Sequence, residues 1–285
     1  MAGDGLLTYV AAFILVNGVG NYVLFKKTEK KVITDFDHVK IAKLSSQYSI
    51  VKNIPDEIKI LVKIIEEKVD SENLKNLYNN LSNVKVRQSF LLLLQGIKGQ
   101  YNGEENILEY SLKTAKGHEL LHLASSYYDK KNNICQSGFI THIGNVTFGR
   151  ALNEGYTDLL TRRLFNSGTS FYNGEVKITR FFELLLNKKE MEKYYFNNDM
   201  PGLIKQLSNY VSREEAIKLI TLFDFGFALK RQGNPAYLLV YEDLQLKLCN
   251  IYNKNKPKSL LKQYEYLQLL DESIVTKTVQ KIKIK

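Results

Sequence analysis

The chain opens with a long apolar run. Residues 5–25 carry no charged side chain, and four lysines follow directly in the stretch KKTEKK. A helix needs roughly 20 apolar residues to cross a bilayer core, so residues 1–31 are expected to hold a single membrane span and anchor the protein. Lysines on the C-terminal side of the run favour a cytoplasmic location for the rest of the chain. The alternative is a buried helix or strand pair in a soluble cytoplasmic protein.

Residues 32–96 show apolar positions at helical spacing. Pro55 is followed by DEIKILVKIIEEKV, and a proline before acidic residues is typical of a helix start. Ser71 opens a second amphipathic stretch, SENLKNLYNNL. We therefore predict a helical N-terminal region that serves as scaffold.

The pattern changes at residues 97–111, IKGQYNGEENILEYS. Two short apolar runs flank a polar loop that contains an Asn-Gly pair, which predicts a β-hairpin. The second strand of this hairpin should cover Ile107 to Tyr110. The segment GHELLH then lies on a predicted helix from about Leu112 to Tyr127.

Further elements follow toward the C-terminus. A second hairpin is expected near Gly138 to Phe148, and a helix should run from Arg150 to about Phe165. Residues 168–285 read as mostly helical, and their lysine-rich end, KTVQKIKIK, is a frayed end or an edge strand. The pattern thus predicts a predominantly helical α+β fold with a small sheet packed on the helix of residues 112–127.

Composition narrows the class of protein. The 285 residues carry a net charge of +10 and are 44% hydrophobic, which indicates a folded protein. The lysines are spread along the chain, so we expect no nucleic-acid partner; a basic module for nucleic acid or membranes would rest on charge alone. Two cysteines, Cys135 and Cys249, make no disulfide framework, and Cys135 is expected to be structural.

The segment GHELLH supplies candidate chemistry. His118 and His122 are four residues apart, so on a helix both imidazoles lie on one face and can bind one metal ion. Glu119 lies close to that face, where it can reach a metal-bound water. Zinc lowers the pKa of its water and polarises a carbonyl, while a nearby glutamate accepts the proton.

A third ligand is expected downstream. Ser125 and Tyr128 stand where HExxHxxGxxH would need glycine and histidine, so that pattern is excluded. Glu154 follows His122 by 32 residues, and Asp158 lies one helical turn further on in NEGYTD. One carboxylate can bind the metal and the other can accept a hydrogen bond from a ligand histidine. The alternatives are a solvated acidic helix face, or His142 as third ligand or electrophile.

HELLH followed by NEGYTD resembles the gluzincin branch of zinc metallopeptidases, the thermolysin-like group. The resemblance covers roughly residues 97–165. It implies a zincin-like catalytic core over residues 97–167, with one Zn²⁺ per chain held by His118, His122 and Glu154. It implies Glu119 as general base and Asp158 as the partner that orients a ligand histidine.

The resemblance also implies a substrate-binding strand and an oxyanion donor. The strand Ile107, Leu108, Glu109, Tyr110 resembles the edge strand that binds extended peptides by β-addition. Gluzincins use a downstream Tyr or His to stabilise the oxyanion, and Tyr156 and Tyr172 are the candidates here.

The sequence therefore predicts a membrane-anchored zinc metallopeptidase that acts on a peptide or protein. Its alternative is a catalytically silent zinc-binding structural or interaction protein at a membrane surface. Glu119 argues against that alternative, because a purely structural zinc site has no use for it.

Overall fold

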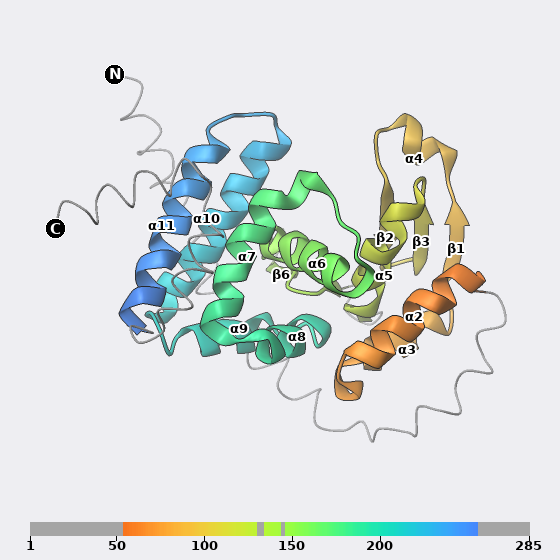
Figure 1. Ribbon diagram of the computed structural model, residues 1–285, viewed down its shortest axis with the longest axis horizontal. Helices are drawn as coiled ribbons and strands as arrows, with labels where there is room; N and C mark the ends of the chain where they lie inside the picture. The colour runs from red at the N-terminus through yellow and green to blue at the C-terminus, as the bar shows by residue number, and fades with distance from the viewer. Residues whose placement is uncertain (1–53, 130–133, 144–145, 256–285) are drawn as a thin grey trace.

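The computed structural model describes residues 54–129, 134–143 and 146–255 (Figure 1). The predicted span, residues 5–25, and the tail after residue 255 lie outside them. Within the described part, no helix has both the length and the apolar character needed to cross a membrane.

The predicted scaffold helices are present. Helix α2 covers Asp56–Lys68 and buries Ile58, Val62 and Ile65, which share one face at helical spacing. The second predicted helix, which opens at Ser71, begins as a 3-10 turn at Ser71–Asn73 and continues as α3, Lys75–Leu81.

A three-stranded sheet follows, with strand order β1-β3-β2. The predicted hairpin is confirmed as β2, Gly99–Asn102, antiparallel to β3, Ile107–Tyr110. Strand β1, Lys85–Gln88, was not predicted; it pairs in parallel with β3, and the short helix α4, Phe90–Leu94, lies in the crossover.

The added strand corrects one expectation. Because β3 is paired on both sides, the stretch Ile107, Leu108, Glu109, Tyr110 is the centre of the sheet and the edge-strand prediction is wrong. The outer strand on the hairpin side is β2. Both β2 and β3 pack against α5, so the expected contact between the small sheet and this helix is confirmed.

Helix α5, Lys116–Ala124, is shorter than predicted. The hydroxyls of Ser125 and Ser126 donate to the carbonyls of Leu121 and His122, which satisfies acceptors that the helix end leaves open. Strand β4, Ser126–Asp129, begins where the last turn of the predicted helix was expected. It pairs with β5, Ile134–Ser137.

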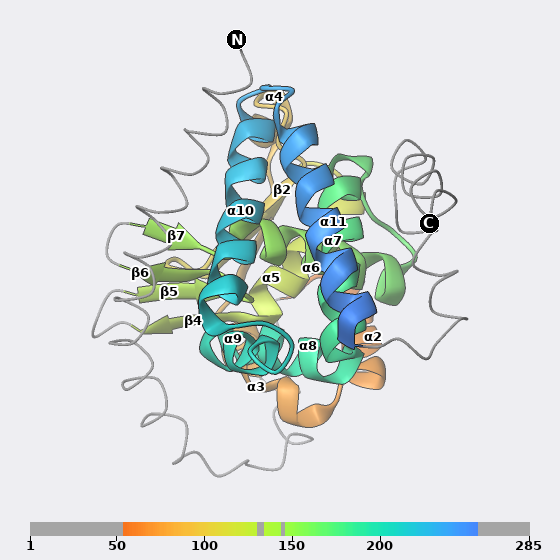
Figure 2. The same cartoon turned by 90° about the vertical axis from the view of Figure 1, so that its left-hand side faces the viewer.

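The second predicted hairpin is confirmed as β6, Thr141–Ile143, and β7, Val146–Phe148. Figure 2 shows β4 to β7 together on one side of the helices. Helix α6 has the predicted bounds, Arg150–Phe165.

The C-terminal region is helical as far as it is described. Its helices are α7 Asn173–Leu186, α8 Lys188–Phe196, α9 Met200–Leu207, α10 Arg213–Arg231 and α11 Tyr237–Asn255. Helix α6 packs between α5 and α7, and one cluster of buried apolar side chains extends from α2 to α11. The protein is thus predominantly helical α+β, and α5 and α6 meet at its centre (Figure 1).

Candidate metal centre

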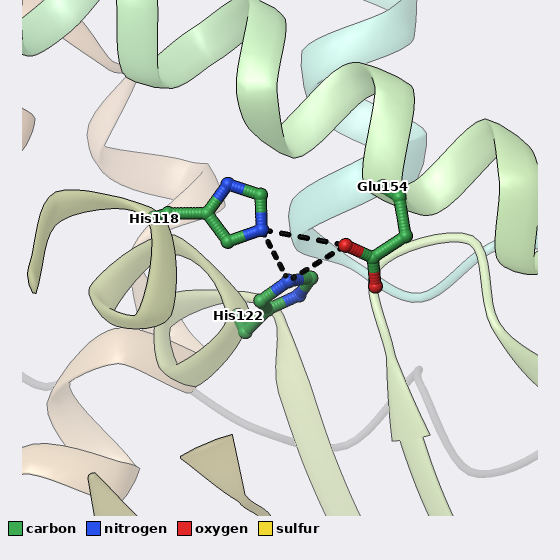
Figure 3. Close-up of side chains that lie close together, drawn as sticks. All are labelled: His118, His122 and Glu154. Carbon is green, nitrogen blue, oxygen red and sulfur yellow. Dashed lines mark hydrogen bonds and ion pairs between the residues drawn. The ribbon is translucent and has the colours of Figure 1, made fainter. Parts of the chain in front are cut away.

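Three side chains from α5 and α6 converge on one point (Figure 3). The Nε2 atoms of His118 and His122 are 3.1 Å apart, and Oε2 of Glu154 lies 3.4 Å from the first and 3.7 Å from the second. Ligands bound to zinc at about 2.0–2.2 Å in tetrahedral geometry are roughly 3.4 Å from each other. The three atoms therefore have the spacing of one zinc coordination sphere.

Close packing of α5 on α6 brings these groups together. A Cβ atom at Gly117 would lie 2.5 Å from Cδ2 of Phe165, so only glycine leaves room for this aromatic ring at the end of α6. Gly155, next to the third ligand, is equally tight: its Cβ would lie 2.3 Å from Oγ1 of Thr179 on α7. The glycines of GHELLH and NEGYTD thus set the distances between the helices.

Asp158 lies where the sequence placed it, behind His118. Its Oδ1 is 4.0 Å from Nδ1 of His118, a buried nitrogen with no hydrogen-bond partner. Arg162 and the amide of Thr169 hold the carboxylate from the other side, at 2.7 Å and 3.0 Å. A proton on Nδ1 would face this carboxylate, which leaves Nε2 free to bind a metal.

Asn153 contacts the candidate metal centre, and sequence reasoning assigned it no role. Its amide lies 3.4 Å from Nδ1 of His122, and its Oδ1 accepts from the backbone amide of Phe139 at 3.1 Å. The side chain is fully buried. Its position directly before Glu154 was the available signal, since a polar residue there must face the protein interior.

Glu119 is buried beside the cluster, at 7% exposure. Burial raises the pKa of its carboxyl, although the two histidines act in the opposite direction and a backbone hydrogen bond from Tyr101 also stabilises the ionised form. Strand β2 passes so close that a Cβ at Gly99 would lie 2.8 Å from Cγ of Glu119. The strand therefore fixes the glutamate in the site.

The two candidate tyrosines have different environments. Tyr172 stacks on His118, with ring centroids 5.5 Å apart and planes at 7°, and its side chain hydrogen-bonds Glu154. Burial, together with the charge of Glu154, raises the pKa of this phenol, which keeps it protonated. Tyr156 is fully buried and packs against Phe139 and Tyr195. Its assignment as oxyanion donor is therefore corrected, because its ring lies in the core.

Two further side chains with metal-binding atoms, His142 and Cys135, are not suited to complete the candidate metal centre. His142 is exposed on β6, 3.5 Å from Oγ1 of Thr147, and the cluster of ligand atoms does not include it. Cys135 on β5 faces the same cavity as the histidines, but burial raises the pKa of its thiol to about 11. A thiol held protonated is a poor metal ligand.

A cavity of about 270 Å³ opens over the cluster. Its walls come from β2, α5, the strands β4 and β5, and the turn that carries Tyr172. The β2 residues Gly99, Gln100 and Tyr101 line it, whereas none of the β3 residues Ile107 to Tyr110 does. The cavity thus joins the three ligands, Glu119 and Tyr172 beside the outer strand of the sheet.

Comparisons with known proteins give no relative. The chain matches no protein-family model, no curated protein and no solved structure. The function must therefore be argued from the site itself.

Proposed function

We propose that the protein is a zinc-dependent metallopeptidase of the gluzincin type, with one zinc ion per chain. The observation that carries the proposal is the His118–His122–Glu154 triangle with Glu119 buried at its side. Two histidines and a glutamate leave one coordination position open, as catalytic zinc sites do, whereas structural zinc sites close with four ligands.

The donor set suits zinc for a further reason. The buried Nδ1 atom of His118 has no hydrogen-bond partner and lies 4.0 Å from Oδ1 of Asp158. This arrangement is expected of a histidine that binds a metal through Nε2. When bound, zinc would supply Lewis acidity toward a water molecule and toward a carbonyl oxygen.

Glu119 would move the proton. Its carboxylate accepts a proton from the attacking water and later donates it to the leaving amine, which breaks the peptide bond without a charged amine anion. Burial raises the pKa of this carboxyl, which favours the protonated form that must donate to the leaving amine.

Tyr172 would act on the carbonyl oxygen. Its protonated hydroxyl reaches Glu154 and its ring is fixed against His118, so the donor stands beside the ligands before substrate arrives. A hydrogen bond that strengthens as negative charge develops on this oxygen stabilises the transition state.

Substrate would lie along β2. The amide of Ser111 donates to the carbonyl of Lys98, so the alternation of an antiparallel pair turns the backbone groups of Gly99 and Tyr101 away from β3. The amide of Tyr101 hydrogen-bonds Glu119, so an added peptide would meet the backbone groups of Gly99 and the carbonyl of Tyr101. An extended peptide can add to this edge directly over the cavity. The predicted β-addition is thus retained in the proposal, with β2 in place of β3.

The proposal is tested by metal content and hydrolysis in the same preparations. Purified full-length wild type, Glu119→Gln and Glu154→Ala are loaded with zinc, dialysed, analysed by mass spectrometry and assayed on a peptide library. Wild type should hold one zinc and cleave; E119Q should keep zinc but lose at least about 10²-fold in rate. E154A should lose most of its zinc, and exposed Glu214→Gln is the matched control.

Three results would contradict the proposal. A folded wild type that takes up no zinc has no metal centre. Zinc retained fully by E154A removes Glu154 from the ligand set. If wild type binds zinc and E119Q cleaves as fast as wild type, Glu119 is not the base. If wild type binds zinc but cleaves no peptide, the catalytically silent alternative is favoured.

A further inference from the structure

The crossover between β1 and β2, together with Leu112 after β3, exposes several large apolar side chains. We call this group the apolar tip; its members and exposed fractions are Phe90 69%, Leu91 69%, Leu93 45%, Leu94 69%, Ile97 38% and Leu112 38%. Single exposed leucines are ordinary, but adjacent ones mark an interaction surface.

The local structure holds these side chains outward. Within α4 only Leu92 is buried, and its carbonyl accepts from the amide of Ile97, which closes the turn. Moving one large apolar side chain out of water lowers the free energy by roughly 1.5–3 kcal/mol, so binding of the apolar tip to an apolar surface would be favourable.

Within its own stretch of sequence the apolar tip carries only positive charge, and the nearest acidic side chain in α2, Glu57, faces Lys116 and Lys113. The sequence holds no Asp or Glu between Gln88 and Gly103, and the sole charged residue of that stretch is Lys98. Its carbonyl accepts from the amides of Ser111 and Leu112, so the neighbouring Lys113 is brought to the same end of the sheet. Both lysines are exposed. Apolar side chains rimmed by lysine suit an anionic lipid interface.

The first turn of α2 lies on the same side. Glu57, in the first turn of α2, accepts from the hydroxyl of Tyr110 at 3.0 Å, and the carbonyl of Tyr110 accepts from Ser89, directly before α4. In Figure 1, α2 and α4 lie on the side opposite α10 and α11. The first turn of α2, near the start of the described chain, is therefore linked through Tyr110 to Ser89, the residue before α4.

We propose that the apolar tip inserts into the headgroup region of an anionic lipid bilayer. Phe90, Leu91 and Leu94 supply the buried area, and Lys98 and Lys113 contact acidic headgroups. Because Gly99 begins β2 directly after Lys98, this contact brings the open edge of the sheet to the membrane surface. The inference does not depend on zinc or on catalysis.

The chain contains no tryptophan, so Phe90→Trp gives a unique fluorescent reporter at the tip. The full-length variant is mixed with vesicles of phosphatidylcholine and phosphatidylglycerol. We expect a blue shift and quenching by bromine-labelled acyl chains. The matched control is Lys218→Trp, at an exposed position on α10, which should show neither change. Adding Leu91→Asp and Leu94→Asp to the F90W chain should abolish both signals.

Other outcomes would overturn the proposal. A fluorescence spectrum that vesicles leave unchanged means that the tip does not meet lipid. A blue-shifted spectrum protected from acrylamide before lipid is added means that another segment of the chain covers the tip. A blue shift that grows with protein concentration alone identifies a second copy of the chain as the occupant.

Discussion

The phenol ring of Tyr172 lies parallel to the imidazole of His118, with a centroid distance of 5.5 Å. These residues are far apart in sequence, and the turn Ser170–Tyr172 that joins α6 to α7 brings them together. The stack fixes the Tyr172 hydroxyl beside His118, one of the ligands in the proposed zinc site. Neither HELLH nor NEGYTD contains this tyrosine.

Tyr172→Phe keeps the stack and removes the hydroxyl. We expect kcat to fall by about 10²–10³-fold, the usual cost of removing one oxyanion donor, with zinc content unchanged. Steady-state kinetics and metal analysis measure both. Tyr156→Phe is the control and should leave kcat unchanged, because its buried hydroxyl has no partner in the described structure. Equal rates for Y172F and wild type would remove Tyr172 from the mechanism.

Lys230 on α10 holds the turn that carries Tyr172. Its ammonium donates to the carbonyl of Phe171 and to both oxygens of the fully buried Glu175, at 2.7 Å and 2.8 Å. The hydroxyl of Tyr241 donates to the same carboxylate at 2.5 Å. In the proposed mechanism Lys230 would be a positioning residue, because it holds Phe171, the neighbour of Tyr172.

Replacing Lys230 with Met should lower kcat about 10-fold or more with zinc content unchanged, since a slightly displaced catalytic group loses rate steeply. The unpaired Glu175 would also destabilise the fold by about 3–5 kcal/mol. Lys230→Met with Glu175→Gln removes both charges, so it should recover stability but not kcat. Urea unfolding and kinetics of the two variants separate these effects. Full recovery of kcat in the double variant would make Lys230 purely structural.

Sequence patterns predicted most of the helices and the three side chains, His118, His122 and Glu154, that the structure brings together. Helix α6 was predicted at its observed bounds because a clear change from short strands to an apolar helical pattern begins at Arg150. Spacing predicted that Glu154 and Asp158, one turn apart, share a face of the helix, and the resemblance to gluzincins implied Glu154 as the ligand. By the same rule Tyr156, two positions after Glu154, lies about 200° around the helix and faces the core.

Other features depend on contacts distant in sequence. Strand β1, KVRQ, is short and mostly exposed, so its apolar pattern is too weak to predict a strand that makes β3 central. The position of Tyr172 depends on how α7 and α10 pack, which no local pattern encodes. The membrane-span prediction for residues 5–25 stays a prediction, because it concerns residues outside those described.

Gly99→Ala tests the contact between β2 and the general base. The new methyl group would lie 2.8 Å from Cγ of Glu119 and 2.9 Å from Cβ of Ala115, so the glutamate must move. We expect kcat to fall at least about 10-fold while one zinc is retained, because the displaced group is the base and not a ligand. Kinetics and metal analysis check this result. Unchanged activity would show that Glu119 need not stay against β2.

Asp158→Asn tests the support of His118. The amide cannot stabilise a proton on Nδ1 as a carboxylate does, so zinc affinity should fall about 10–100-fold. Competition with a chromogenic chelator measures the affinity. Asp243→Asn, at an exposed position on α11, should leave it unchanged. Wild-type affinity in D158N would mean that the 4.0 Å approach of Asp158 to His118 does not orient the ligand.

Asp224 predicts how stability depends on pH. It accepts from the amides of Gly149 and Ala151, at 2.6 Å and 2.8 Å, where α6 begins, and burial raises its pKa from 3.8 to about 7 despite these bonds. Between these values the folded protein retains a proton that the unfolded chain has released, so stability falls as pH rises.

Asp224→Asn removes this titration. Relative to D224N, wild type should lose on the order of 4 kcal/mol of unfolding free energy between pH 4 and pH 7, from about 1.4 kcal/mol per pKa unit. Urea unfolding of both proteins at several pH values, with a chelator present to exclude metal effects, measures the difference. A constant difference across this range would mean that the carboxylate is already ionised at pH 4 and caps α6 as an anion.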